Sequence, residues 1–292
     1  TADPSLDLQA DGFVNAILLY PDGRFLVAGS FQTIGGQPRP LIARILPTGV
    51  LDPAFNAGAI LGNGGGGPGA APFVSAIAVQ PDGRIVIGGQ FSSVAGSPRF
   101  NLARIESDGS LDETFTAGAD APVAVLSVQP DGRILVGGNS FSLAGGPRGG
   151  LGRLHPGGVR DETFSPPPAT AFVNSLIVMA DGRILASGAF SLPGEPPRPL
   201  IQLEANGTLD PLFKPGCDGA VFGIALQDDG KVLVAGMYDL LSGQLRPSLG
   251  RLNPAHPGAQ SLTLAGDTLR WFRTGSLPAA NHVAFEYSND GE

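Results

Sequence analysis

The chain has 292 residues, a formal net charge of −8 and a single cysteine, Cys217. The negative charge argues against a nucleic-acid or anionic membrane partner, and one cysteine excludes a disulfide within the chain. No apolar run approaches the roughly 20 residues of a membrane-spanning helix. The 44 glycines, 27 prolines and 15% charged residues are typical of a turn-rich, all-β protein.

The first repeat predicts four short strands over residues 13–20, 25–30, 41–46 and 51–55. Asp22-Gly23 separates the first two strands, and an Asp-Gly pair supplies the positive φ that a tight hairpin requires. Apolar residues show no helical spacing in this stretch. The repeat is therefore predicted to be a four-stranded antiparallel meander.

This pattern occurs five times, with the aspartates of successive Asp-Gly pairs 60, 49, 50 and 48 residues apart: Asp22, Asp82, Asp131, Asp181 and Asp229. The long first interval holds a glycine-rich insertion at 62–72. First strands such as 74–79 are apolar on both faces, which indicates that each sheet is covered on both sides. Four-stranded sheets that cover one another radially form a β-propeller. The main alternative, a β-solenoid, is contradicted by the tight hairpins.

Two series of aromatic positions repeat with the same period and predict a core between blades. One series follows the second strand: Phe31, Phe91, Phe141, Phe190 and Tyr238. The other ends the fourth strand: Phe55, Phe115, Phe164 and Phe213, with Leu6 at the equivalent place near the N-terminus.

The N-terminal residues predict how the ring closes. A Leu-Asp-x-x-Phe motif opens the fourth strand of four repeats, at Asp52, Asp112, Asp161 (in a variant form) and Asp210. Residues 3–6 match it, whereas the fifth repeat lacks it. An N-terminal strand that completes the last blade would give five blades of four strands and leave no free edge. It would also pair Asp3 with Arg251, as the equivalent arginines Arg44, Arg104 and Arg153 pair with their own aspartates.

The tail divides the chain into a propeller at 1–252 and a β tail at 253–292. Its predicted strands are 261–265, 268–273 and 282–288. They fit a degenerate sixth blade or the start of a truncated β-sandwich. We favour five blades plus a tail.

Residues 2–252 resemble the delta-60 repeat family through Gln-Pro-Asp-Gly-Arg, an apolar strand, a Pro-Arg loop and Leu-Asp-x-x-Phe. The tail, with Trp271-Phe272-Arg273 and residues 285–291, resembles the start of a fibronectin-like segment. The resemblance implies a bacterial, exported β-propeller and no catalytic motif. The chain begins at Thr1 without methionine, so we expect processing, and a secreted or cell-surface location.

An arginine recurs in the loop between the second and third strands of every repeat, 16 residues after the turn glycine: Arg39, Arg99, Arg148, Arg198 and Arg246. In a ring they would form an annulus suited to carboxylates, sulfates or phosphates. A structural role, bonding loop carbonyls, is the alternative.

Three carboxylates occur 12 residues before the turn glycine, at Asp11, Asp120 and Asp218, where the other repeats have Ala71 and Thr170. With the arginines they form a candidate ligand site, and an Asx-type loop bond is the alternative. Inward-facing positions are predicted at Asn15, Ser75, Ala124, Asn174 and Phe222. They supply no carboxylate pair for glycoside hydrolysis, and the three histidines lack the spacing of a zinc site.

We therefore expect a non-catalytic extracellular propeller with no cofactor or metal. It would bind a glycan or a surface protein through the face that carries these loops. One alternative is an enzyme acting on acidic polysaccharides at the channel mouth. The other is an assembly unit of a surface fibre that self-associates through its tail.

Overall fold

A computed structural model describes residues 6–62, 71–146, 148–167, 170–253, 255–256, 258–265, 268–275 and 277–278. These residues form strands, turns and loops, with no helix among them, so none is available to cross a membrane. The all-β class is confirmed.

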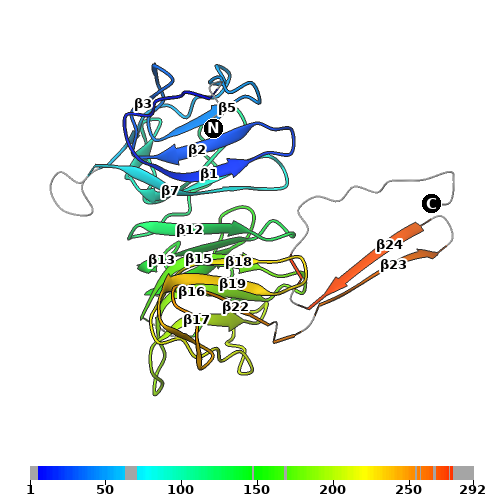
Figure 1. The fold of residues 1–292 in the computed structure, drawn as a ribbon. Coiled ribbons are helices and arrows are strands. Elements are labelled where there is room, and N and C mark those ends of the chain that lie inside the picture. Colours follow the sequence, from blue (N-terminus) through cyan, green and yellow to red (C-terminus); the bar gives the residue numbers. More distant parts are fainter. Residues whose placement is uncertain are drawn as a thin grey trace.

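Five groups of three antiparallel strands, which we call blades 1 to 5, follow one another along the chain (Figure 1). The groups of blades 3 and 4 are joined into one six-stranded sheet by a single residue pair, Asn139 with Phe172. Blade 1 contains β1 (Val14–Leu19), β2 (Phe25–Gly29) and β5 (Ile42–Ile45). Blade 2 contains β7 (Phe73–Val79), β8 (Ile85–Gln90) and β11 (Leu102–Ile105). Blade 3 contains β12 (Val123–Val128), β13 (Ile134–Ser142) and β14 (Arg148–Leu154). Blade 4 contains β15 (Thr170–Val178), β16 (Ile184–Ser191) and β17 (Arg198–Leu203). Blade 5 contains β18 (Ala220–Leu226), β19 (Val232–Met237) and β22 (Leu249–Leu252).

Very short strands lie in the loops between the second and third blade strands and, in the case of β6, in the connection from blade 1 to blade 2. They are β3 (Thr33–Ile34), β4 (Gln37–Pro38), β6 (Ile60–Leu61), β9 (Ser93–Val94), β10 (Ser97–Pro98), β20 (Leu240–Leu241) and β21 (Gln244–Leu245). β3 pairs with β4, β9 pairs with β6 and β10, and β20 pairs with β21. We call the side of the molecule with these hairpins the loop face, and the side with the Asp-Gly turns the turn face.

The predicted fourth strand is the main difference from the sequence expectation. Leu51 makes a single bridge to Ile45, and Leu111, Arg160 and Leu209 do the same in the next three blades. The chain then turns, because the carboxylate of Asp52 accepts a hydrogen bond from the backbone N–H of Ala54 at 2.9 Å. This local bond competes with a ladder, so the motif that predicts a fourth strand forms an Asx turn instead.

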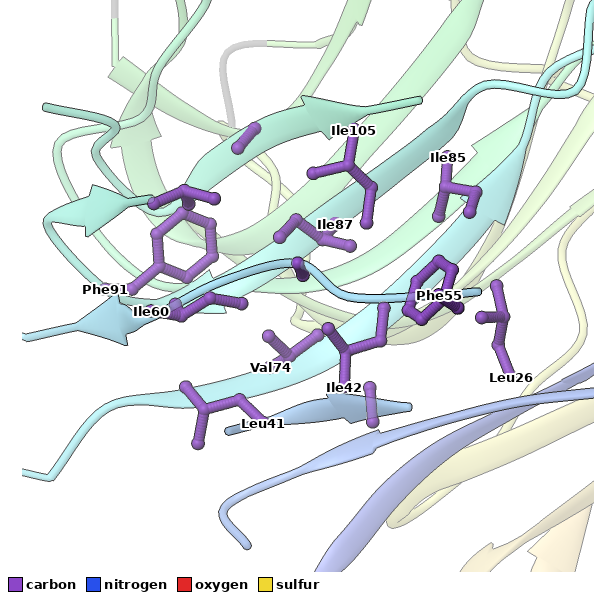
Figure 2. Close-up of a cluster of buried hydrophobic side chains, with 14 residues drawn as sticks. Leu26, Leu41, Ile42, Phe55, Ile60, Val74, Ile85, Ile87, Phe91 and Ile105 are labelled. Carbon is purple, nitrogen blue, oxygen red and sulfur yellow. The ribbon is translucent and has the colours of Figure 1, made fainter. Parts of the chain in front are cut away.

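The core lies between blades, as predicted. Phe55 and Phe91 are buried in a cluster that joins blades 1 and 2, together with Leu26, Ile42 and Ile87 (Figure 2). Equivalent clusters join blade 2 to 3, 3 to 4 and 4 to 5. The first strands of successive blades contact one another along the stack: β1 with β7, β7 with β12, β12 with β15 and β15 with β18.

Closure of the ring rests on the N-terminal residues, and Asp3 lies outside the described ones. Leu8 and Ala10 pack on blade 1 itself, against the cluster that contains Phe31. The carbonyl of Leu8 accepts a hydrogen bond from the N–H of Gly35. Within the described residues, no strand of blade 1 pairs with a strand of blade 5.

Two of the three predicted tail strands are present, as β23 (Ala259–Ala265) and β24 (Thr268–Thr274). They form a separate hairpin that extends away from the blades (Figure 1). A hydrogen bond from the N–H of Ala180 to the carbonyl of Leu277 at 2.7 Å and a bridge between Met179 and Pro278 attach the segment after this hairpin to blade 4. The third predicted strand, 282–288, lies outside the described residues.

Candidate functional site

The predicted inward-facing positions coincide with a β-bulge in the first strand of every blade. The ladder between the first and second strands shifts register at each of them: Asn15, Ser75, Ala124, Asn174 and Phe222. A bulge re-aims a side chain, and here it is aimed at the neighbouring blade. Asn15 Nδ2 donates to the carbonyl of Val74 at 3.2 Å, and Ser75 Oγ donates to that of Val123 at 2.5 Å. These polar side chains therefore connect successive blades.

The three candidate carboxylates hold the loop-face hairpins. Asp11 accepts hydrogen bonds from the N–H groups of Gln32 and Thr33 at 2.7 and 2.9 Å. Asp218 accepts two equivalent bonds in blade 5, and Asp120 accepts one from the N–H of Ser142 at 2.7 Å. Hydrogen bonding to backbone N–H groups lowers the pKa of Asp11, with Thr33 contributing most. These bonds join residues 21 or 22 positions apart, so they hold the hairpins at long range and are not Asx turns, and a ligand role for the three carboxylates stays a prediction.

The recurring arginines also bond within their own loops. Nη1 of Arg39, Arg99 and Arg246 donates to the carbonyl of the preceding residue at 2.8, 2.8 and 2.7 Å. Arg99 is buried and pairs with Glu113 at 2.7 Å, and Arg198 pairs with Glu195. The side chain of Arg148 lies outside the described residues. The four described arginines thus serve their hairpins, and their role as an anion annulus stays a prediction.

A second set of arginines lies between blades on the turn face. Arg104 pairs with Asp112 at 2.7 Å, stacks on Phe115 at 4.7 Å from the ring centre, and donates to the carbonyl of Pro156 in blade 3. Arg44 and Arg153 repeat this arrangement with Ser107 and Ala205. Both members of these pairs are nearly inaccessible, so each pair also needs the extra hydrogen bonds that it makes.

Blade 4 departs from this arrangement, and the sequence analysis did not predict the partners of its aspartate, Asp210. Gln202 replaces the arginine and donates to Asp210 at 2.9 Å. His256, from the segment after blade 5, lies 3.0 Å from the same carboxylate. The histidine that looked isolated in the sequence is therefore a partner of a buried aspartate. The signal was the break in the arginine series at residue 202.

One departure from the repeat that reaches solvent is Phe100. The residue after the loop arginine is Pro40, Gly149, Pro199 or Pro247 in the other repeats. Phe100 is instead 58% exposed and lines a cavity of about 670 Å³ on the loop face between blades 2 and 3. Gln90, Asn101, Asp120 and Ser142 also line this cavity. Sequence reasoning found Asp120 but missed Phe100.

Asn101, beside Phe100 in this cavity, is held by hydrogen bonds on both sides of its side chain. Asn101 adopts a φ of 59°, a conformation that asparagine tolerates better than most residues. Its side chain accepts a hydrogen bond from the N–H of Phe91 at 3.2 Å and donates to the carbonyl of Ala119 at 2.9 Å. The Asn101 side chain thus connects blade 2 to the segment that leads into blade 3, which holds the backbone beside Phe100.

A second, wider hollow of about 710 Å³ lies on the loop face at blades 1 and 2, lined by Phe13, Asn15, Ser30, Phe73 and Ser75 among others.

No cluster of histidine, cysteine and carboxylate side chains suited to a metal ion occurs among the described residues. Burial raises the pKa of the Cys217 thiol, which is the direction expected for a small apolar residue rather than a nucleophile.

Five stretches of the chain match the family described as "Domain of unknown function (DUF5122) beta-propeller": residues 21–55, 80–115, 129–164, 180–213 and 227–255. The matches together cover more than half of the chain. They confirm the β-propeller fold and the resemblance to a bacterial propeller-repeat family at this level. The fibronectin-like character of the tail stays a prediction. No curated protein matches the chain.

Several solved structures are similar at low sequence identity. PorZ, an essential bacterial surface component of the type-IX secretion system of Porphyromonas gingivalis, has a TM-score of 0.44 at 9% identity, over 94% of this chain and 47% of its own. A mannose phosphorylase from Leishmania mexicana has a TM-score of 0.33 at 13% identity, over 77% and 80%. A glycosyl hydrolase from Bacteroides ovatus has 0.31 at 15%, over 85% and 85%. The chain thus spans less than half the length of PorZ.

Proposed function

We propose that this chain, which belongs to the DUF5122 β-propeller family, is an extracellular, non-catalytic module that binds a glycan in the loop-face cavity beside Phe100. The observation that carries the proposal is the exposed aromatic ring at a place where the other repeats have proline or glycine. A feature that every blade shares serves the blade, whereas a feature of one blade is free to serve a ligand.

The chemistry of the cavity supports a sugar. An aromatic face offers apolar area at little entropic cost, and the polar groups around it, such as Gln90 and Ser142, can orient hydroxyl groups. A pyranose ring has this combination of one apolar face and a rim of hydroxyls. The cavity volume of about 670 Å³ is in the range that ligand pockets occupy and exceeds that of a single sugar ring.

Binding is favoured over hydrolysis because the nearest carboxylates are already engaged. Asp11 and Asp120 belong to different blades, and each accepts hydrogen bonds from the backbone of its own hairpin. A glycosidase needs two carboxyl groups at a set separation on either side of the glycosidic bond. Asp11 and Asp120 instead accept hydrogen bonds from the loop backbone. A neutral glycan is favoured over an acidic one, since Arg99 is paired with Glu113.

The test is calorimetric titration with neutral trisaccharides such as cellotriose and maltotriose, beside trigalacturonic acid. Phe100→Ala should weaken binding of the neutral sugar about tenfold or more, since that loss corresponds to about 1.4 kcal/mol. Phe272→Ala, which removes a similarly exposed ring from the tail, is the matched control and should leave affinity unchanged.

Equal affinity of the wild type and Phe100→Ala would contradict the proposed site. Heat only with trigalacturonic acid, lost in Arg246→Ala, would favour the arginine annulus instead. Release of shorter sugars during the titration would favour the enzymatic alternative.

A further inference from the structure

The two hollows of the loop face meet at one pair of residues in blade 2. The wider hollow is lined by Phe13 of blade 1 and Phe73 of blade 2, and the cavity beside Phe100 is lined by Gln90 of blade 2. Phe73 and Gln90 are partners in the ladder between β7 and β8. Partners in an antiparallel ladder lie about 5 Å apart and point to the same side of the sheet. The two hollows are therefore about one strand spacing apart at this pair.

Phe13 faces the contact between blades 1 and 2. Its N–H donates to Oγ of Ser30 at 3.1 Å, and its carbonyl accepts a hydrogen bond from the N–H of Ser30 at 2.9 Å. This is the register pair that Phe73 and Gln90 form in blade 2. Gln90 lines a cavity toward blade 3, so the equivalent pair of blade 1 points toward blade 2, which contributes Phe73 and Ser75 to the wider hollow. The exposure of Phe13 therefore belongs to an internal contact and does not depend on the outer side of blade 1.

The wider hollow combines exposed aromatic surface with uncharged polar groups. Phe13 is 80% exposed, whereas the equivalent residue is Pro122 in blade 3 and Ala220 in blade 5. Ser30 accepts a hydrogen bond from the N–H of Phe13, and a hydroxyl group can also donate one. The residues that line the hollow, Asn15 among them, carry no charge. An aromatic face beside neutral hydrogen-bonding groups suits a neutral sugar ring better than an acidic one.

We propose that the hollow at Phe13 and Phe73 is a second sugar-binding subsite, continuous with the cavity beside Phe100. The ligand is then a neutral oligosaccharide chain that runs over the loop face from blade 3 to blade 1, rather than a short sugar. This inference rests on the proposed function, because the sugar units in the cavity beside Phe100 bring the rest of the chain to Phe13.

The dependence of affinity on chain length follows from this arrangement. Once one end of a chain is bound, its other end reaches the second subsite as an intramolecular event with a high effective concentration. A longer chain therefore binds more tightly only if it reaches a second set of contacts. Stacking on Phe13 supplies such a contact, and its loss affects long chains alone.

Calorimetric titration of the whole chain with maltotriose and maltohexaose, and with cellotriose and cellohexaose, tests the subsite. In the series that binds, the hexasaccharide should bind the wild type about tenfold or more tightly than the trisaccharide. Phe13→Ala should remove this gain and leave the affinity for the trisaccharide unchanged, whereas Phe100→Ala should weaken binding of both sugars. Circular dichroism checks that Phe13→Ala folds, which is expected because the ring is already in solvent.

Phe172→Ala is the matched control, since Phe172 holds the equivalent register position in blade 4 and is 43% exposed. It should leave the affinities for both sugars unchanged. A hexasaccharide that binds no more tightly than a trisaccharide would overturn the subsite and leave the proposed function standing. A gain that survives Phe13→Ala, or that Phe172→Ala removes equally, would also overturn the subsite. No binding of either sugar to the wild type would overturn the subsite and the proposed function together.

Discussion

The Leu-Asp-x-x-Phe motif concentrates three interactions on a few side chains. Asp112 ends the third-strand turn with one carboxylate oxygen, which accepts hydrogen bonds from the backbone and side chain of Thr114 at 2.9 and 2.5 Å. Its other oxygen binds Arg104, whose guanidinium covers the ring of Phe115. The aspartate therefore couples a local turn to the contact between blades 2 and 3.

These interactions make the stability of the fold depend on pH. Burial by itself raises the pKa of Asp112, but hydrogen bonds from Thr114 and Arg104 outweigh it and bring the pKa from 3.8 down to about 2. The pKa of Asp161 in blade 3 falls to about 2 by the same balance. A carboxylate whose pKa is lower in the folded state stabilises the fold above its unfolded pKa and loses that effect as pH falls through the folded one.

We therefore expect the free energy of unfolding in urea to fall between about pH 4 and pH 2. Asp112→Asn should cost about 3–5 kcal/mol at pH 7, because Arg104 stays buried without its carboxylate. The same variant should lose less stability than the wild type on acidification. Glu162→Gln, which removes an exposed partner of Arg160, is the control and should change little at either pH. Equal acid sensitivity of Asp112→Asn and the wild type would assign the loss to other groups.

At the scale of the strand pair, one glycine permits the bulge that aims a side chain at the next blade. In blade 2 this residue is Gly89, opposite Val74 in the ladder. A Cβ added to Gly89 would lie 2.1 Å from the carbonyl oxygen of Phe73, a distance at which backbone must move. Gly29 and Gly188 have the same constraint in blades 1 and 4, at 1.8 Å.

Gly89→Ala should therefore destabilise the chain by about 3 kcal/mol or more, because the first strand must leave its register to make room. Gly157→Ala is the matched control, since no atom lies within 4 Å of its added Cβ. That variant should stay within about 1 kcal/mol of the wild type. Urea unfolding of both variants measures the difference, and similar values for the two would show that the bulge is not sterically fixed.

The periodic features of these elements were predictable, because identical local chemistry repeats. Each Asp-Gly pair forms its turn, as at Asp22, which accepts a hydrogen bond from the N–H of Arg24, with Gly23 at a φ of +84°. The buried aromatic residues were predictable for the same reason. The absence of a fourth strand was not predictable. The sequence around Asp52 is compatible with a strand ladder and with the Asx turn that the structure shows.

The candidate site was predictable only in part, because it lies where the period fails. Asp120 was found by its spacing, but the cavity depends on Phe100, which has no equivalent in the other repeats. The partner of Asp210 was missed for a related reason. His256 comes from the segment after blade 5, and its contact with Asp210 crosses 46 residues of chain.

At the scale of the whole molecule, each blade contacts the blades that come before and after it in the chain. Among the described residues, blades 2, 3 and 4 share a core with a blade on each side, whereas blades 1 and 5 share one with a single blade, and Leu8 and Ala10 pack on the other side of blade 1. Stability in such a series is approximately a sum of repeat terms and nearest-neighbour terms. The end blades therefore have one interface term fewer, which lowers the free energy of opening them locally.

Hydrogen exchange followed by mass spectrometry should show this gradient. Amides of β8, β13 and β16 should exchange most slowly, and those of β2 and β19 faster, although all five are second strands with the same ladder. His256→Ala removes a contact between Asp210 of blade 4 and the segment after blade 5, so it should speed exchange in β19 and leave β2 unchanged. Uniform exchange in all five strands at low concentration would instead indicate a single cooperative unit, in which the ends are covered within one chain.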